Sequence, residues 1–197
     1  MGWIWLLTYG NNNLVSNLYS IIDTDIDFNR LLKDMNYFLE SNQLTHYEQV
    51  SLTSVSGEND WTCSVGSMST LKEPEESYCT INKALVGTYI ADLINKYSSY
   101  YRWRLLKLNP KQTYSVHCDA FCGYENFRVH IPVITNSDSY FCFYDNKPTH
   151  NISCIVRHIH FKAGRSYKVN TTGFHSAVNY GKTIRYHMVG VFNSKLL

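Results

Sequence analysis

Hydrophobic positions recur at helical spacing in two segments of the first half of the chain. Residues 28–39 place Phe, Leu and Met side chains three and four positions apart, directly after Asp27, an acid suited to capping a helix. Residues 83–97 repeat this spacing with Leu, Tyr and Ile. We therefore predict two amphipathic helices. The Ser-, Gly- and Asn-rich residues 51–69 between them are typical of short strands and loops.

After residue 102 the pattern changes to short runs rich in Val, Ile, Tyr, Phe and Thr, separated by turn residues such as Gly164, Gly173 and Gly181. Such runs predict strands of an antiparallel sheet. The predicted strands cover residues 103–108, 113–117, 127–134, 140–144, 155–161, 166–169 and 183–191. Short strands at this spacing indicate a sandwich or barrel with the helices packed on its outside. We therefore expect a mainly β fold with flanking α-helices.

Length and composition fit one globular domain. The chain has 197 residues, of which 44% are hydrophobic and 15% aromatic, and no repeat or linker divides it. We expect a single domain over residues 1–197, in which residues 1–100 support a β core formed by residues 101–192. The formal net charge is +2 with 17% charged residues, so we expect neither a nucleic-acid partner nor an acidic one.

No apolar segment is long enough to predict a transmembrane helix. The run over residues 3–7, Trp-Ile-Trp-Leu-Leu, lacks the cationic start and the small-residue cleavage site of a signal peptide. We interpret it as a buried first strand or strap, and we expect a soluble, cytoplasmic protein without a membrane partner. In a domain of this length without a secretion signal, the six cysteines are expected to be reduced thiols.

Two ionisable side chains on one predicted strand are the first sign of chemistry. Side chains two positions apart in a strand point to the same side, so His117 and Asp119 are expected to lie together while Cys118 faces away. A second histidine, His175, follows in a later run. Two histidines and one carboxylate are a ligand set of non-haem Fe(II) sites, which leave other positions open. Arg185, ten residues further on, can bind a dicarboxylate through paired hydrogen bonds.

As a set, these motifs resemble the aspartyl/asparaginyl β-hydroxylase group of Fe(II)- and 2-oxoglutarate-dependent dioxygenases. The matching motifs lie between residues 102 and 191 and are His117-x-Asp119, Arg128-x-His130-Ile-Pro, His175-x-Ala-x-Asn179 and Arg185. The animal members lack the carboxylate that Asp119 supplies, so the resemblance is nearer to the proline-hydroxylase type. Halogenating relatives in the wider superfamily replace this carboxylate with a small residue, so hydroxylation is favoured here.

The resemblance implies a fold, a site and a reaction. The fold is expected to be a double-stranded β-helix, the jelly-roll or cupin-like form of the sandwich. The implied site residues are His117, Asp119 and His175 as Fe(II) ligands, and Arg185, Arg128 and His130 as contacts of 2-oxoglutarate, with Arg185 on its distal carboxylate. The implied reaction hydroxylates a C–H of an amino acid, free or within a peptide, and releases succinate and CO2. Ascorbate is the expected reductant in assays.

Two further residues are expected near this site. His187 faces the same side of its predicted strand as Arg185, and Asn179 follows His175 in the same run. We expect both to line the pocket. The substrate, a small molecule or a peptide with an amino-acid moiety, is expected to contact the N-terminal half and the loop over residues 136–151, which we interpret as a lid.

Other interpretations of the same residues are open. A zinc site built on Cys118 and Cys122 lacks the second similar cysteine unit that such sites favour. His158 and His160 share one strand face, but no carboxylate accompanies them. No Gly-x-Ser-x-Gly motif supports a serine hydrolase. A jelly roll can also be a catalytically silent binding or assembly domain, or carry a metal-dependent reaction that does not use 2-oxoglutarate.

Overall fold

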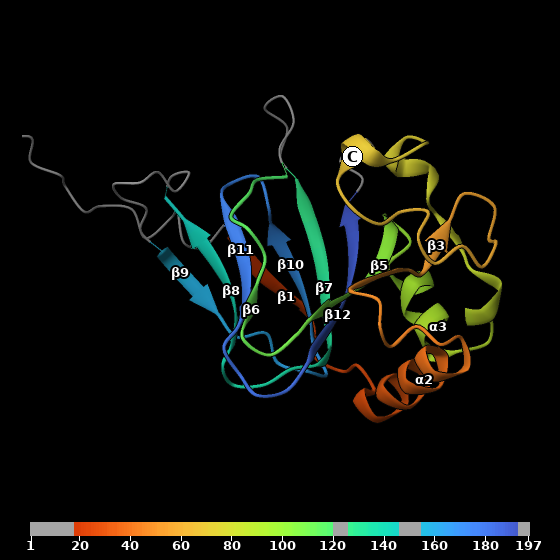
Figure 1. Cartoon of the computed structure of the whole chain (residues 1–197), viewed down its shortest axis with the longest axis horizontal. Coiled ribbons are helices and arrows are strands. Elements are labelled where there is room, and N and C mark those ends of the chain that lie inside the picture. Colours follow the sequence, from red (N-terminus) through yellow and green to blue (C-terminus); the bar gives the residue numbers. More distant parts are fainter. Residues whose placement is uncertain (1–17, 120–125, 146–154, 193–197) are drawn as a thin grey trace, which may run out of the picture.

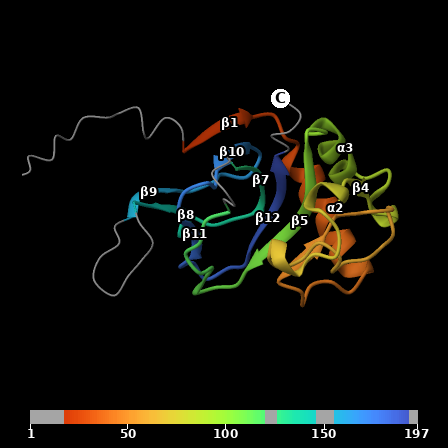
Figure 2. The same cartoon turned by 90° about the horizontal axis from the view of Figure 1, so that it is seen from above.

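Two antiparallel sheets face each other, and helices lie against the outer side of the larger one (Figures 1 and 2). The computed structural model describes residues 18–119, 126–145 and 155–192. Within them, the larger sheet has the order β1 (Tyr19–Asp23), β10 (Ser166–Asn170), β7 (Phe127–Ile134), β12 (Arg185–Phe192), β5 (Tyr100–Leu108) and β2 (Gln49–Ser51). The smaller sheet has the order β6 (Gln112–Thr113), β11 (His175–Asn179), β8 (Ser139–Tyr144) and β9 (Ile155–Ile159). A separate pair joins β3 (Thr53–Ser54) to β4 (Thr80–Ile81).

The first predicted helix is confirmed and the second is shorter than predicted. Helix α2 (Phe28–Ser41) begins after Asp27, whose side chain accepts a hydrogen bond of 3.0 Å from the amide of Arg30. Helix α3 (Tyr89–Lys96) starts six residues later than the apolar spacing indicates, because Gly87 takes a φ of 84° and Thr88 caps the new start. The remaining helical turns are the 3-10 segments η1 (Met68–Thr70), η2 (Glu75–Ser77) and η3 (Lys83–Leu85).

The larger sheet has an apolar outer face and a polar inner face. Alternate residues of β7 and β12 pack with α2 and α3 in one buried cluster, among them Val129, Ile131, Val133, Tyr186 and Met188. The residues between them point to the other side, toward the smaller sheet. These inward residues are Arg128 and His130 of β7 and Arg185 and His187 of β12, all buried. The helices therefore shield the apolar face, which leaves the inner face free for polar groups.

A second apolar cluster fills part of the space between the sheets. Its buried members are Leu108, Phe141, Phe143, Phe161, Tyr167, Val169 and Ala177. Phe161 and Tyr167 stack with ring centroids 4.5 Å apart, and Phe141 and Phe161 stack at 5.6 Å. This aromatic packing holds the two sheets together and confines the polar side chains to the rest of the interior.

The predicted strand over residues 113–117 is wrong in its extent. Strand β6 ends at Thr113, which pairs with Val178, yet His117 forms an isolated bridge with His175. Between these two pairs the chain advances four residues, from Thr113 to His117, but only three along β11, from Val178 to His175. One surplus residue therefore interrupts the ladder, as in a β-bulge. Strand 127–134 is found as predicted, whereas β1 and β11 lie outside the predicted strands.

Two expectations about chain segments need correction or lie outside the described residues. Residues 136–151 do not form one lid loop, because residues 139–144 are strand β8 in the smaller sheet. Residues 146–151 and the apolar run over residues 3–7 lie outside the described residues. No helix in the described part of the chain is long and apolar enough to cross a bilayer.

Strand β5 contains a bulge that turns Tyr100 and Trp103 to the same side of the sheet. Tyr100 and Trp103 are three positions apart, yet both pack in the cluster beneath the helices. The pairing with β12 shifts by one residue between Val189 and Val191, and Arg102 takes a φ of 49° at this point. A Cβ built on Gly190, opposite the bulge, would lie 2.8 Å from the Trp103 ring. The bulge therefore depends on the absence of a side chain at Gly190.

Substitution of Gly190 by Ala is expected to destabilise the fold by about 1–3 kcal/mol, because a methyl group there overlaps the buried indole of Trp103. Chemical unfolding monitored by circular dichroism measures this loss. Gly173→Ala is the matched control, since no atom lies within 4 Å of a Cβ at that position. Equal stability of the two variants would contradict the assigned contact.

Candidate functional site

A cavity of about 600 Å³ lies between the two sheets. Its walls are formed by the inward side chains of β5, β7 and β12, by residues 114–119 after β6, and by β11 of the smaller sheet. The 3-10 segment η1 and Gly66 border one end. The cavity is therefore the part of the interior that the aromatic cluster does not fill.

His117, Asp119 and His175 converge on one side of this cavity. One ligand-capable atom from each of the three lies within 4.8 Å of the others. The histidines are held by reciprocal backbone hydrogen bonds, 3.0 Å from the His117 amide to the His175 carbonyl and 2.8 Å in the reverse direction. The amide of Asp119 donates a 3.0 Å bond to the carbonyl of Thr171. The structure thus brings together the three residues that the sequence predicts as metal ligands.

The hydrogen bonds of the two histidine rings determine which nitrogen is free. Nδ1 of His117 lies 2.8 Å from the carbonyl of Ser115, and Nδ1 of His175 lies 2.9 Å from the carbonyl of Gly173. Because a carbonyl oxygen only accepts, Nδ1 carries the hydrogen in the neutral form of each ring, and Nε2 then keeps a lone pair. These Nε2 atoms lie 3.7 and 3.8 Å from the carboxylate oxygens of Asp119. Metal-binding histidines are commonly oriented in this way, by a hydrogen bond from the ring nitrogen that does not bind the metal.

The surroundings hold these groups in the protonation states that a metal ion needs. Burial lowers the pKa of His175 to about 4, although the charge of Asp119 opposes this shift. Burial alone would raise the pKa of Asp119, but the Arg128 charge and hydrogen bond, together with His175, hold it well below its usual range. At neutral pH the His175 ring is therefore neutral and the Asp119 carboxylate is ionised.

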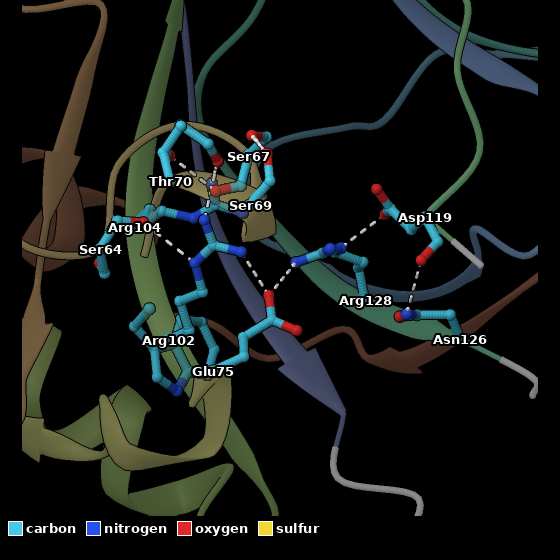
Figure 3. Close-up of polar contacts among 12 residues, drawn as sticks. Ser64, Ser67, Ser69, Thr70, Glu75, Arg102, Arg104, Asp119, Asn126 and Arg128 are labelled. Atoms are coloured by element: carbon cyan, nitrogen blue, oxygen red, sulfur yellow. Dashed lines mark hydrogen bonds and ion pairs between the residues drawn. The ribbon is translucent and has the colours of Figure 1, made fainter. Parts of the chain in front are cut away.

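A row of alternating charges connects Asp119 to the N-terminal half of the chain (Figure 3). Nε of Arg128 donates a 2.7 Å hydrogen bond to Oδ2 of Asp119. Nη1 of Arg128 lies 3.7 Å from Oε1 of Glu75, which also accepts a hydrogen bond from Nη1 of Arg102. Arg102 in turn donates to the carbonyls of Ser64 at 3.0 Å and Gly66 at 2.7 Å. Segment η2 is therefore tied to the candidate metal site through paired charges.

Arg185 presents a buried cation to the cavity, as predicted from its order after His175. No carboxylate in the described residues lies within 4.0 Å of it. Its Nε and Nη2 atoms lie 3.0 and 2.8 Å from the two ring nitrogens of His187. Burial lowers the pKa of Arg185 to about 10, so it stays charged at neutral pH. Burial and this charge lower the pKa of His187 well below its usual value.

His130 lines the cavity between these groups. Its Nδ1 is buried without a hydrogen-bond partner among the described residues, and its ring packs edge-on against Phe141. Burial, followed by the charge of Arg185, lowers its pKa well below the usual value. The neutral His130 ring is a cavity-lining residue that a ligand in the cavity can contact.

Asn179 lies away from the cavity lining, contrary to its expected place in the pocket. Its amide donates to the carbonyls of Leu108 at 3.1 Å and Thr183 at 2.8 Å, and its oxygen accepts from Gly181 and Asn136 at 3.1 Å. These bonds fix the connection from β11 to β12. The polar atoms of Asn179 are therefore already engaged in holding the turn that positions Arg185.

Among the described residues, no cysteine belongs to the group of possible metal ligands formed by His117, Asp119 and His175, and neither do His158 and His160. Cys63, Cys79, Cys118 and Cys142 are free thiols, and Cys122 and Cys154 lie outside the described residues. Cys118 does not face away from the site, because it borders the cavity. His158 packs against Tyr140 and His160 lies 3.0 Å from the carbonyl of Ser139, so both have structural contacts.

Sequence reasoning singled out Arg128 but missed Glu75 and Arg102, which continue the row of charges beyond it. Glu75 sits in a segment without a recognisable motif, and its contacts to Arg102 and Arg128 join parts far apart in the chain. Arg102 and Arg104 offered one signal, because two cations two positions apart interrupt an otherwise apolar strand. Buried charges of this kind mark a polar cavity wall or an ion-pair network.

Comparison with known proteins shows similarity in structure without similarity in sequence. No protein-family model matches the chain, and no curated protein matches it. A Trichoplax adhaerens prolyl hydroxylase, solved with a hypoxia-inducible-factor peptide fragment, is 12% identical with a TM-score of 0.52, over 93% of this chain and 87% of that chain. A viral collagen prolyl hydroxylase from Paramecium Bursaria Chlorella virus-1 is 9% identical with a TM-score of 0.51, over 97% and 98%.

The fold is a double-stranded β-helix. This confirms the jelly-roll fold that the strand pattern and the resemblance predict. A Burkholderia pseudomallei oxidoreductase of the 2OG-Fe(II) oxygenase family is also similar, but over only 48% of this chain and 44% of that chain, with a TM-score of 0.38 and 15% identity. At these identities the two prolyl hydroxylases establish the fold alone and leave the activity to be argued from the site.

Replacement of Asp119 by Asn is expected to lower stability at pH 7 by about 3 kcal/mol, because it leaves the buried charge of Arg128 without its nearest partner. The folded-state pKa of Asp119 is depressed, so its contribution is complete above the unfolded pKa of about 3.9 and is lost as pH falls through the folded pKa. The difference between wild type and variant should therefore shrink below about pH 4.

Urea unfolding at pH 7, 5 and 3 measures this pH dependence. Asp138→Asn, which changes an exposed carboxyl, is the control and should match wild type at each pH. A stability difference for Asp119→Asn that stays constant down to pH 3 would show that the ionised carboxylate is not favoured by the fold.

Proposed function

We propose that the protein is an Fe(II)- and 2-oxoglutarate-dependent dioxygenase that hydroxylates a C–H of an amino acid, free or within a peptide, and releases succinate and CO2. One observation carries this proposal. The cavity brings two histidines with free Nε2 atoms and an ionised carboxylate together with a buried arginine, Arg185, that has no acidic partner in the described part of the chain. A metal-chelating dicarboxylate would satisfy both halves of this arrangement at once.

The donor set fits a divalent iron. Two imidazole nitrogens and one carboxylate suit Fe(II) and leave positions for further ligands. His117, Asp119 and His175 would hold the ion, and their ring and carboxylate partners already orient them. When bound, the metal and 2-oxoglutarate supply the oxidising chemistry for the C–H bond. The protein contributes the orientation of both reactants within the cavity between the sheets.

Arg185, Arg128 and His130 are the residues we assign to the cosubstrate. The guanidinium of Arg185 would bind the distal carboxylate, since it is buried and has no carboxylate among its described neighbours. His130 would offer its unused nitrogen. Arg128 donates a hydrogen bond from Nε to Asp119. It also lines the cavity, and its Nη1 is buried without a hydrogen bond. Its role is therefore to fix Asp119 and to present its positive charge to the ligand from the cavity wall.

The proline-hydroxylase type of the aspartyl/asparaginyl β-hydroxylase group is the affiliation we propose. It is supported by Asp119, which occupies the carboxylate position and contacts both histidines. It is also consistent with the fold shared with two prolyl hydroxylases, one of them solved with a peptide. We propose an amino acid or peptide as substrate, a core of residues 101–192 that carries the site, and residues 1–100 as its support.

Purified protein with Fe(II), ascorbate and 2-oxoglutarate is expected to form succinate when the correct amino acid or peptide is supplied. His117→Ala and Asp119→Ala should each lower this activity by more than about 100-fold, beyond the effect typical of residues that only support a ligand. His158→Ala, which changes an exposed histidine on β9, is the matched control and should keep activity.

Metal content gives a second measurement on the same variants. Wild type should bind one Fe(II) or Co(II) per chain, and both ligand variants should bind much less. Full activity in both variants would exclude the assigned ligands. Absence of metal binding and of succinate with every substrate offered would favour a silent jelly-roll that binds or assembles.

Arg185→Gln is expected to raise the KM for 2-oxoglutarate roughly 10- to 100-fold, because the distal carboxylate loses a charged donor pair. Arg157→Gln, a cation on β9 outside the cavity lining, should leave this KM unchanged. Steady-state succinate formation at varied 2-oxoglutarate measures the effect. An unaltered requirement for 2-oxoglutarate in Arg185→Gln would point to a metal-dependent reaction that does not use this cosubstrate.

A further inference from the structure

Arg104 is a buried cation on the cavity wall without an acidic partner among the residues that the structure describes. It is 7% exposed and lines the cavity from β5. Its Nη1 makes only long contacts of 3.4 Å, to Oε1 of Gln49 and to the carbonyl of Gly66, and its Nε has no hydrogen-bond partner. No ion pair among the described residues includes Arg104. Its donors are therefore available to a ligand.

The neighbouring cations are balanced, and Arg104 is not. Arg128 is paired with Asp119, and Arg102 is paired with Glu75. Burial, together with the charges of Arg102 and Arg128, lowers the pKa of Arg104 to about 9, although the charges of Glu75 and Asp119 oppose this shift, so Arg104 is still protonated at neutral pH. A buried, unbalanced charge is unfavourable unless an anion joins it. This wall of the cavity therefore favours a negatively charged group.

The cosubstrate does not account for this anion. On the proposed function, 2-oxoglutarate uses one carboxylate at the metal ligands and the other at Arg185. Arg104 pairs with Val189, four positions along β12 from Arg185, which is roughly 13 Å at the rise of a strand. A diacid bound at Arg185 and at the metal has no third carboxylate for Arg104. The second unbalanced cation thus points to a second anionic molecule.

The position of Arg104 matches that of a substrate lying across the sheet. Val189 pairs with Arg104 on β5 and with His130 on β7, so Arg104 and His130 are two strands, roughly 10 Å, apart. Asp119 lies on the β7 side of this row, through its bond to Arg128. The side chains of Arg104 and His130 both reach into the cavity. A molecule of amino-acid size can therefore extend from the metal ligands to Arg104.

We propose that Arg104 binds a carboxylate of the substrate, which makes the substrate an amino acid with a free α-carboxylate or a peptide with an acidic side chain. The inference rests on the proposed function and adds the chemical class of its substrate. The Nε and Nη donors of a guanidinium match the two oxygens of a carboxylate. Ser67 and Ser69 border the same cavity, with hydroxyl oxygens 2.7 Å apart. Their hydroxyl groups offer further hydrogen bonds to the same anion.

The test is a binding measurement on the full chain loaded with Mn(II) and 2-oxoglutarate without oxygen, so that no turnover occurs. Ligand-observed NMR titrates free L-amino acids against their α-amides, and capped tripeptides centred on Asp or Glu against those centred on Asn or Gln. The proteins are wild type, Arg104→Gln, Arg104→Lys and Lys107→Gln. Lys107 is the matched control, because it is a cation of the same strand outside the cavity lining.

Wild type and Lys107→Gln are expected to bind at least one carboxylate probe and to reject its amide counterpart. Arg104→Gln should weaken that binding roughly 10- to 100-fold, and Arg104→Lys should restore part of it, since a point charge replaces a planar pair of donors. If the free amino acids bind more tightly than their α-amides, the α-carboxylate is the group that Arg104 binds. If the Asp or Glu peptides bind more tightly than the Asn or Gln peptides, that group is the side-chain carboxylate. Melting temperatures without ligand check folding, and Arg104→Lys carries the test if Arg104→Gln fails to fold.

Two kinds of negative result are distinguishable. If 2-oxoglutarate binds to the Mn(II)-loaded wild type and Arg185→Gln weakens it, the proposed function stands. In that case, equal binding of carboxylates and amides, no effect of Arg104→Gln, or no binding of any probe would overturn the assignment of Arg104 alone. If 2-oxoglutarate itself does not bind, the proposed function is overturned and this inference with it.

Discussion

Charge balance inside the sandwich is the constraint on which the site depends. A buried charge is tolerated only when a partner of opposite sign or a ligand compensates it. In the interior, Arg102, Glu75, Arg128 and Asp119 follow one another with alternating charge. Each of these groups is therefore neutralised by its neighbour. This row joins the first half of the chain to the candidate metal ligands. The N-terminal half therefore does more than cover the sheet, because one of its carboxylates completes the electrostatics of the cavity.

The polar interior is possible because the larger sheet has a separate apolar face. Helices α2 and α3 bury the odd-numbered residues of β7 and Trp103 of β5, and this packing supplies a core that does not depend on the space between the sheets. In a sandwich whose only core lay between the sheets, several buried arginines and histidines would remove most of the apolar contact. Because the two faces of the sheet have different roles, a stable fold is compatible with a charged cavity.

Local patterns in the sequence were sufficient for the elements that obey simple periodicity. Helix α2 and strand β7 follow regular spacing, and His117, Asp119 and His175 converge as their order indicates. The bulges were not predictable, because a surplus residue in one strand is defined only by its partner strand. Glu75 and the position of Asn179 were missed for a related reason. Their contacts join residues far apart in the chain, and no local pattern encodes such contacts.

The reciprocal backbone bonds between His117 and His175 link the metal-binding geometry to the pairing of two segments that are distant in sequence. Neither histidine can shift along its chain segment without breaking a bond to the other. Both amides are therefore engaged in the same pair, and their exchange with solvent deuterium requires the segments to separate. The same separation would disperse the ligand set. Hydrogen exchange at these two amides consequently reports on the integrity of the site. A bound ion would add its binding free energy to the cost of separating the segments, and the exchange rate would fall by the corresponding factor.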